Sequence, residues 1–233
     1  RKDYREDIAL VVVMGSYIYN DTHGRSDLDM FFVPKTRRGR NVSFTFILDD
    51  IGFDYWDISW ERLERIAGYE EPITSIITEG KVLYCASESD RRRFDALKAR
   101  ALDASTTLDF VTMAGRRLEE ADGDYRRLLQ AQGLSDARMS SVAIIHKVAF
   151  ALALVNRITV KRGRGKLKQE IMDMPLVPLD FATLYDRVFL CDDIHELQHA
   201  YGQMLENTGA LIAREREAHA RPCSFVEKLG GFY

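Results

Sequence analysis

The amino-acid sequence predicts an α+β protein in two parts, a small mixed-sheet domain over residues 1–87 and an all-α helical-bundle domain over residues 88–233. Short apolar runs of strand length, separated by polar turns, fill the chain up to about Ala86. Beyond Ser87, apolar residues recur at helical spacing over long segments. The chain has 233 residues and is 46% hydrophobic, so it can bury a core in each part.

The first part is expected to contain five strands. The continuous apolar run over residues 9–14 is typical of a strand that is buried on both faces. The other strands are expected at residues 27–33, 42–48, around Asp54 and at 81–85, with a hairpin turn at 49–52 and short helices at 60–67 and 73–78.

The second part is expected to be helical throughout. Gly133 marks a break between its first two long helices, and residues 174–178 carry two prolines and form an extended turn. The helices are expected at residues 90–104, 108–131, 137–160, 181–190 and 194–220.

Two aspartates stand at the start of the second predicted strand. Side chains two residues apart in a strand point to the same face, so Asp27 and Asp29 direct two carboxylates at one point. Two like charges that close repel each other unless a cation lies between them. Magnesium is the expected occupant, because it prefers carboxylate oxygens and leaves coordination positions for water and phosphate.

A glycine–serine step follows the first predicted strand directly. Gly15 allows a backbone or a ligand to approach closely, and residues 16–20 are expected to open a short helix whose N-terminus favours an anion. Gly15 and Ser16 therefore form a candidate phosphate-binding turn beside the aspartate pair.

This arrangement resembles the nucleotidyltransferase superfamily, which includes DNA polymerase β and the aminoglycoside nucleotidyltransferases. The signature is an apolar residue, a glycine and a glycine or serine, followed about a dozen residues later by an acid–apolar–acid triplet. Residues 14–16 and 27–29 match these two elements, and Ser26 fits the common form of the motif. The match by motif covers roughly the first 86 residues; the second part matches only in being a helical domain that follows a catalytic one.

The resemblance implies a third carboxylate on a neighbouring strand, between two apolar residues. Asp54 and Asp57 are both candidates, and strand alternation places them on opposite faces, so only one can join the pair. Asp54 lies between Phe53 and Tyr55, as the family pattern requires, and is favoured as a general base or a third metal ligand. Asp57 is expected to be a strand-end residue.

Several residues are expected to contact the nucleotide. Relatives often carry an arginine shortly after the glycine–serine step; this chain has none there, and Arg25 is expected to substitute from the other end of the loop. The segment 161–168 holds five cations and no acid, and is either a solvated loop or a loop that neutralises the triphosphate. Its strongest candidates are Arg164 and Lys166.

The resemblance implies a Mg²⁺-dependent transfer of a nucleoside monophosphate from an NTP, expected to be ATP, to an acceptor hydroxyl. The preferred acceptor is a small hydroxylated molecule such as an aminoglycoside-like antibiotic, which would make the protein an adenylyltransferase-like resistance enzyme. Two alternatives remain open at this point. One is an antitoxin-type nucleotidyltransferase that modifies a protein or tRNA, and the other is an inactive nucleotide-binding sensor.

Charge, hydropathy and cysteine content predict the partners and the cellular location of the protein. A net charge of -3 and a sequence pI near 6.0 argue against a protein that coats nucleic acid by charge. No run is expected to be long enough to span a membrane. Cys85, Cys191 and Cys223 are far apart and odd in number, which predicts free thiols and a cytoplasmic location. The chain is expected to be a monomer or a homodimer.

Overall fold

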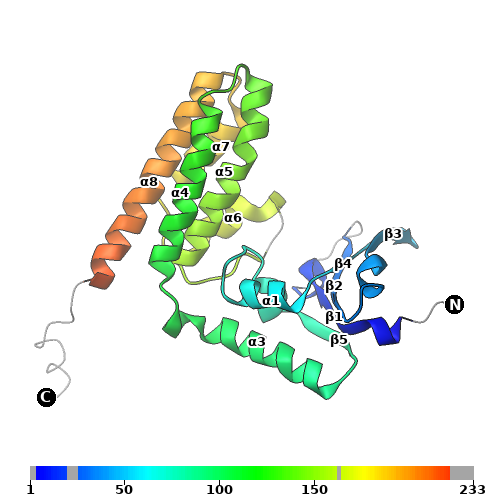
Figure 1. The fold of residues 1–233 in the computed structure, drawn as a ribbon. Coiled ribbons are helices and arrows are strands. Elements are labelled where there is room, and N and C mark those ends of the chain that lie inside the picture. The colour runs from blue at the N-terminus through cyan, green and yellow to red at the C-terminus, as the bar shows by residue number, and fades with distance from the viewer. Residues whose placement is uncertain (1–3, 20–25, 162–163, 221–233) are drawn as a thin grey trace, which may run out of the picture. The chain divides into compact units, whose positions relative to one another are not determined.

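The structure is a computed structural model that describes residues 4–19, 26–161 and 164–220 (Figure 1). Residue contacts divide the chain into two units. Unit 1 comprises Arg1–Leu108 together with Thr159–Arg164, and unit 2 comprises Asp109–Ile158 and Gly165–Tyr233. The fold is α+β, with a mixed sheet in unit 1 and helices alone among the regular elements of the described part of unit 2.

Unit 1 is built on a five-stranded sheet of order β3-β4-β2-β1-β5 (Figure 1). The β2–β4 pair is parallel and the other pairs are antiparallel, so the sheet is mixed as expected. The strands are β1 (Ile8–Met14), β2 (Leu28–Pro34), β3 (Phe44–Leu48), β4 (Ile51–Asp57) and β5 (Lys81–Cys85), and the short 3-10 helices are η1 (Arg5–Asp7), η2 (Gly15–Tyr17) and η3 (Gly39–Val42).

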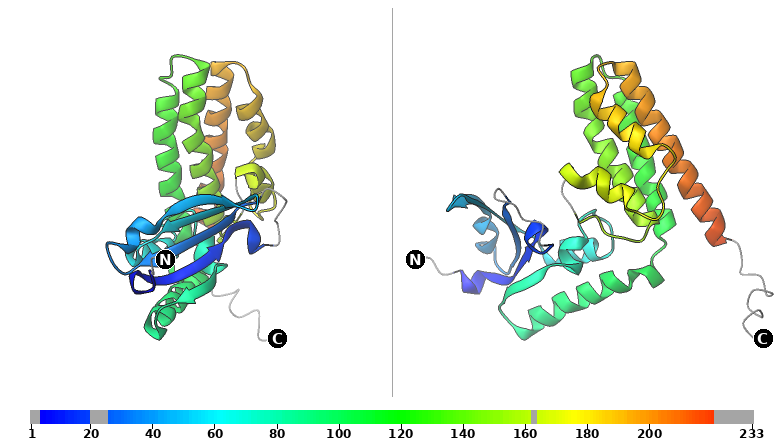
Figure 2. Two further views of the ribbon diagram at one scale, coloured as in Figure 1. Left: turned by 90° about the vertical axis from the view of Figure 1, so that its right-hand side faces the viewer. Right: turned by 180° about the vertical axis from the view of Figure 1, so that it is seen from behind.

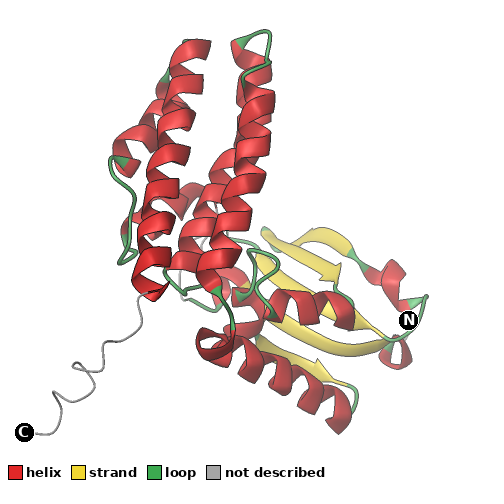
Figure 3. Cartoon of the chain, turned by 60° about the vertical axis from the view of Figure 1, so that its left-hand side comes forward, coloured by secondary structure: helices red, strands yellow, loops and turns green. Residues whose placement is uncertain are grey.

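Helices cover one face of this sheet. They are α1 (Trp60–Ala67), α2 (Ser75–Thr78) and α3 (Glu88–Thr107), and Figure 3 shows α1 and α3 lying along the same side of the strands. Ser59 caps α1 by accepting a hydrogen bond from the Arg62 backbone N–H. The core between sheet and helices contains Leu10, Val12, Phe31, Val33, Leu63, Ile66, Ile77 and Phe94.

The division between the units differs from the expected boundary at residues 87 and 88. Ser87 does cap α3, accepting from the Asp90 backbone N–H, so a helix begins there as predicted. However, Phe94, Leu97 and Ala101 of that helix are buried in the same core as the sheet. Helix α3 therefore belongs to unit 1, because its few apolar residues are buried in the core of that unit with the strands, α1 and α2.

Unit 2 is a bundle of antiparallel helices (Figures 1 and 2). Helix α4 packs on α5 and α8, and α8 also packs on α5 and α7. The elements are α4 (Phe110–Leu128), α5 (Leu134–Val155), η4 (Arg164–Lys166), which begins with the last residue of unit 1, α6 (Leu167–Met172), α7 (Phe181–Leu190) and α8 (Ile194–Ala220). Helices α7 and α8 match their predicted bounds. Helix α6 was not predicted; its first two residues were placed in the basic loop 161–168, and no structure was predicted for the rest.

Helix α5 corrects one expectation. Its 22 residues are long and apolar enough to cross a membrane by length and composition, although the sequence was expected to contain no such run. Within the structure, 61% of its most apolar window is buried. Ile144, Val148, Ala151 and Leu152 are among its core residues, so the apolar composition serves packing against α4 and α8.

Candidate active site

The parallel pairing of β2 and β4 brings two predicted carboxylates together. Asp29 and Asp54 are partners in the strand register, and Met14 of β1 pairs with Asp29 on the other side. Paired residues on neighbouring strands direct their side chains to the same face. Phe31 and Trp56, two residues farther along, pack in the core under the helices. The carboxylates therefore lie on the helix-covered face, at the end of the strands where the apolar core stops.

The third carboxylate, Asp27, precedes β2 and reaches over β4. A Cβ atom at Gly52 would overlap the Asp27 carboxylate, so a larger residue there would force the Asp27 side chain to move. Sequence reasoning assigned Gly52 to a hairpin turn and missed this role. The signal that could have found it is a glycine two residues before an aspartate inside a strand.

The electrostatics of Asp29 show that the three carboxylates act on one another. Burial raises the pKa of the Asp29 carboxyl, and the neighbouring Asp54 and Asp27 carboxylates raise it further. Among the described residues, Asp29 is the only aspartate whose pKa is clearly raised. Uncompensated negative charge at a partly buried position is typical of a site that binds a cation.

The turn after β1 places the glycine–serine step against this cluster. Gly15 has φ +73°, a left-handed backbone conformation that favours glycine, and a Cβ atom there would overlap the Asp29 carboxylate. The residues that follow form the single 3-10 turn η2 in place of the short helix expected over residues 16–20. The turn closes through the backbone N–H groups of Ile18 and Tyr19, which donate to Gly15 and Ser16 carbonyls.

Asp54 and Asp57 occupy different environments. Thr45 Oγ1 donates a hydrogen bond of 2.9 Å to Asp54 Oδ1, from the neighbouring strand β3. Asp57 accepts one of 3.0 Å from Ser43 Oγ at the far end of β4, and it pairs with Phe32 in the strand register. The geometry thus brings Asp54 and not Asp57 beside Asp29.

The predicted nucleotide-binding cations are divided between the two units. Arg25 lies outside the described residues, as does the side chain of Arg164. Lys166 belongs to unit 2, where it precedes α6. Ser26, next to Asp27, lies in unit 1 with Gly15 and Ser16.

Lys161 is a cation that sequence reasoning did not single out. It belongs to the segment Thr159–Arg164, which joins unit 1. Its Nζ atom lies 3.0 Å from Glu79 Oε1 and 6.0 Å from the centre of the Tyr19 ring, just after the glycine–serine turn. The basic composition of segment 161–168 was the available signal, but the sequence does not show which of its cations returns to the sheet.

The donor chemistry of the carboxylates suits magnesium. Among the described residues, no group of three or more histidine, cysteine, aspartate or glutamate side chains is close enough to enclose a metal ion. Magnesium is seldom held by an all-protein cage; one or two carboxylates hold it, and water and substrate phosphates complete its shell. Asp29 meets this requirement together with either neighbour, because Asp54 and Asp27 both lie close enough to raise its pKa.

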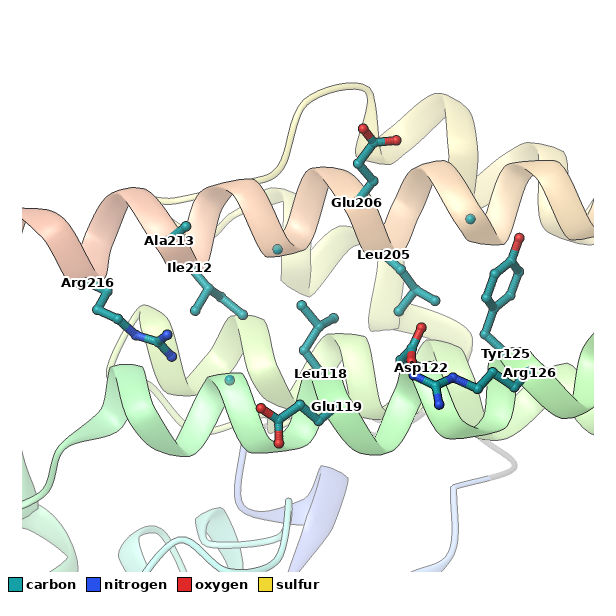
Figure 4. Close-up of a pocket in the computed structure, with 13 residues that line it drawn as sticks. Leu118, Glu119, Asp122, Tyr125, Arg126, Leu205, Glu206, Ile212, Ala213 and Arg216 are labelled. Atoms are coloured by element: carbon teal, nitrogen blue, oxygen red, sulfur yellow. Dashed lines mark hydrogen bonds and ion pairs between the residues drawn. The ribbon is translucent and has the colours of Figure 1, made fainter.

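A separate groove lies in unit 2, between α4 and α8 (Figure 4). It has a volume of about 570 Å³, and Leu118, Leu205 and Ile212 point into it while Glu119 and Arg216 lie at its rim. Two glycines of this groove lie close to long side chains. A Cβ atom at Gly115 would lie 2.8 Å from the Arg216 guanidinium, and one at Gly202 would lie 2.6 Å from the Tyr125 hydroxyl. None of the predicted site residues lines this groove.

Comparisons with known proteins identify no family. No family model matches the sequence, and no curated protein matches it. Among solved structures, the chain is similar to a nucleotidyltransferase-like protein from Exiguobacterium sibiricum, with a TM-score of 0.47 and 12% sequence identity. The match covers 97% of this chain and 81% of that chain.

Proposed function

We propose that this protein is a Mg²⁺-dependent nucleotidyltransferase that moves a nucleoside monophosphate from an NTP to an acceptor hydroxyl. The observation that carries the proposal is the register of the parallel strands, which sets Asp54 beside Asp29, with Asp27 close enough to raise the same pKa. The glycine–serine turn against Asp29 supplies the neighbouring position for phosphate. ATP is the proposed nucleotide, and a small hydroxylated, aminoglycoside-like molecule is the proposed acceptor.

Each carboxylate has a distinct proposed role. Asp27 and Asp29 would hold Mg²⁺, which supplies charge neutralisation for the triphosphate and for the departing pyrophosphate. Asp54 either joins these ligands or accepts the proton of the acceptor hydroxyl, and Thr45 orients it by donating to Oδ1. Because that hydrogen bond occupies one oxygen of Asp54, the other is left for the reaction.

The transfer follows from this placement. The acceptor oxygen forms a bond to the α-phosphorus in line with the leaving group, and its proton passes to Asp54. The bond between the α-phosphorus and its bridging oxygen breaks, and that oxygen leaves with the pyrophosphate. Gly15 and Ser16 are proposed to position the β- and γ-phosphates, with Ser26, Arg25, Arg164 and Lys161, which belong to the same unit, as further contacts.

The experiment is a pyrophosphate-release screen with each NTP and Mg²⁺, across aminoglycosides, other hydroxylated antibiotics, nucleotides and tRNA. Asp29→Asn should reduce release by at least a hundredfold, because it removes a charge from the centre of the cluster while keeping the shape of the side chain. Asp57→Asn is the matched control, since it removes a carboxylate from the same sheet outside the cluster, and it should retain activity. Release that persists in the Asp29→Asn variant would show that the carboxylate assignment is wrong.

A further inference from the structure

The two edges of the sheet differ in how well they are protected. Strand β3 forms one edge, and in the described part of the chain it pairs with β4 alone. All five of its residues are exposed, and Ile47 is 76% exposed. Its sequence, Phe-Thr-Phe-Ile-Leu, contains no charge, no proline and no glycine. An open, uncharged and apolar edge strand offers its free backbone groups to another strand.

Strand β5 forms the opposite edge and carries the usual protection. It begins with Lys81, and its register with β1 shifts between Val11 and Val12, which marks a bulge or irregularity. Charged residues and bulges are the devices by which edge strands avoid pairing with other chains. The contrast within one sheet indicates that β3 is left open for a partner.

The hairpin between β3 and β4 shows which backbone groups face outward. Asp49 and Asp50 both have positive φ, 52° and 61°, as in a type I′ two-residue turn, and Leu48 pairs with Ile51 across it. The pair that flanks such a turn is hydrogen-bonded, and bonded pairs then alternate along the ladder. Thr45 and Ile47 therefore direct their N–H and C=O groups away from β4, toward the open edge.

We propose that two copies of this chain pair through β3, antiparallel and related by a two-fold axis at Phe46. In this register Thr45 of each copy faces Ile47 of the other, so all four outward N–H and C=O groups of each strand segment are bonded. Phe46 then faces its own counterpart, and Phe44 faces Leu48. An interface of this kind is self-complementary, as a two-fold dimer requires, and it closes after two copies.

The size and charge of the surface agree with a dimer of modest affinity. Phe44, Phe46, Ile47, Leu48 and Ile51 are between 38% and 76% exposed, which leaves roughly 450 Å² of apolar surface per copy if such side chains expose about 150–200 Å² in full. Two copies would bury about 900 Å² if all of this surface were covered, slightly below the ~1,000 Å² that a stable specific interface usually exceeds, which agrees with a dimer that dissociates on dilution. The same register carries the Asp49–Asp50 turn toward the segment of the second copy that holds Arg40.

The pairing also places the two active sites on one surface. A two-fold axis perpendicular to the sheet keeps both carboxylate faces on the same side. Asp54 lies one strand from the edge, so the two Asp54 residues would be separated by three strand spacings, roughly 15 Å. This inference stands apart from the proposed activity, because its test measures association and not turnover.

A cysteine cross-link tests the register. In a chain with Cys85→Ser and Cys223→Ser, Phe46→Cys should form an intermolecular disulfide, because residues facing each other in a non-hydrogen-bonded pair have Cα atoms about 4.5 Å apart. Leu48→Cys is the matched control, since it would lie about 13 Å from its counterpart. Cross-linking of Phe46→Cys with little of Leu48→Cys supports the proposal; equal cross-linking of the two, or none, overturns it.

Sedimentation equilibrium tests the association itself. The wild-type chain should be a dimer that dissociates on dilution, and Ile47→Pro should weaken it at least tenfold, because proline removes an outward N–H without disturbing the β3–β4 ladder. Ile47→Lys is the second variant, for use if the proline variant fails to fold. It keeps the N–H but places a charge at the edge, and it should also weaken the dimer. Leu83→Lys, on the opposite edge, should have no effect. A wild-type monomer at about 100 μM, or a dimer that dissociates only with Leu83→Lys, contradicts the proposal.

Discussion

The surroundings of Asp29 disfavour the charged form of its carboxyl. It is partly buried, it faces Asp54 across a parallel strand pair, and Asp27 lies close enough to add to the repulsion. A carboxylate in this position destabilises the metal-free fold, since burial removes part of its hydration and two other carboxylates lie close to it. Carboxylates with raised pKa values are common at sites of binding or catalysis.

The raised pKa of Asp29 predicts how the stability of the metal-free protein depends on pH. An ordinary aspartate has a pKa of 3.8, and that of Asp29 lies above it in the folded state. Between these two values the folded state binds more protons than the unfolded state, so the free energy of unfolding falls as pH rises through the window. Asp29→Asn removes this contribution, and the variant should gain stability relative to the wild type as pH increases.

The measurement is urea unfolding of both proteins at a series of pH values, with divalent cations removed. The difference in unfolding free energy between Asp29→Asn and the wild type should grow across the window and then level off. A difference that stays constant with pH would mean that the folded environment does not raise the pKa of Asp29.

At the scale of elements, the site depends on how strand ends meet. The sequence predicted β2, which carries Asp29 and follows Asp27, and β4, which carries Asp54. Both were recognised as apolar segments of strand length. That the Asp54 strand is a neighbour of the Asp29 strand was implied by the family resemblance alone; the residue pattern does not give the parallel pairing of β2 and β4, since strand pairing is decided by tertiary packing. A glycine two residues before Asp54 was the available signal for Gly52, but its close approach to Asp27 also depends on how the strands pair.

The turn between β1 and η2 gives a second prediction. Gly15→Ala should destabilise the fold by about 1–2 kcal/mol, the cost of a left-handed backbone for a residue with a side chain. It should also displace the Asp29 carboxylate and reduce activity by more than the lost stability explains. Thermal unfolding and pyrophosphate release at a temperature where both proteins are folded separate the two effects.

Gly123→Ala is the matched control for this change. Gly123 lies inside α4, and a Cβ atom there would meet nothing within 4 Å. The substitution should stabilise the protein by up to about 1 kcal/mol, as expected for alanine in a helix interior, and leave activity unchanged. If both glycine substitutions had the same effect, the close packing of Gly15 on Asp29 would have no functional importance.

At the scale of the whole molecule, the chain leaves unit 1, forms two helices of the bundle and returns. The sequence predicted a sheet part and a helical part, but it placed α3 in the wrong one, because a highly charged helix shows few of the apolar residues that decide where it packs. The return of residues 159–164 is likewise a long-range contact that has no local sequence signal.

This return brings Lys161 beside the turn, which leads to a third prediction. Lys161→Met should weaken NTP binding about tenfold, equivalent to 1.4 kcal/mol, if its ammonium group moves from Glu79 to the phosphates. Glu79→Gln should then leave NTP binding equal or stronger, because it releases Lys161. Lys168→Met, which breaks an ion pair with Asp186 in unit 2, is the control. Equal weakening by Lys161→Met and Glu79→Gln would indicate a purely structural ion pair.

The most direct test of the carboxylate site is calorimetric titration of the full chain with a non-hydrolysable ATP analogue, with and without Mg²⁺. The wild type and Asp57→Asn should bind the analogue only when Mg²⁺ is present, and Asp29→Asn should show no measurable binding under the same conditions. Two results would contradict the account: binding that is unaffected by Asp29→Asn, or a wild-type protein that does not bind the analogue in the presence of Mg²⁺, nor the matching analogues of the other NTPs.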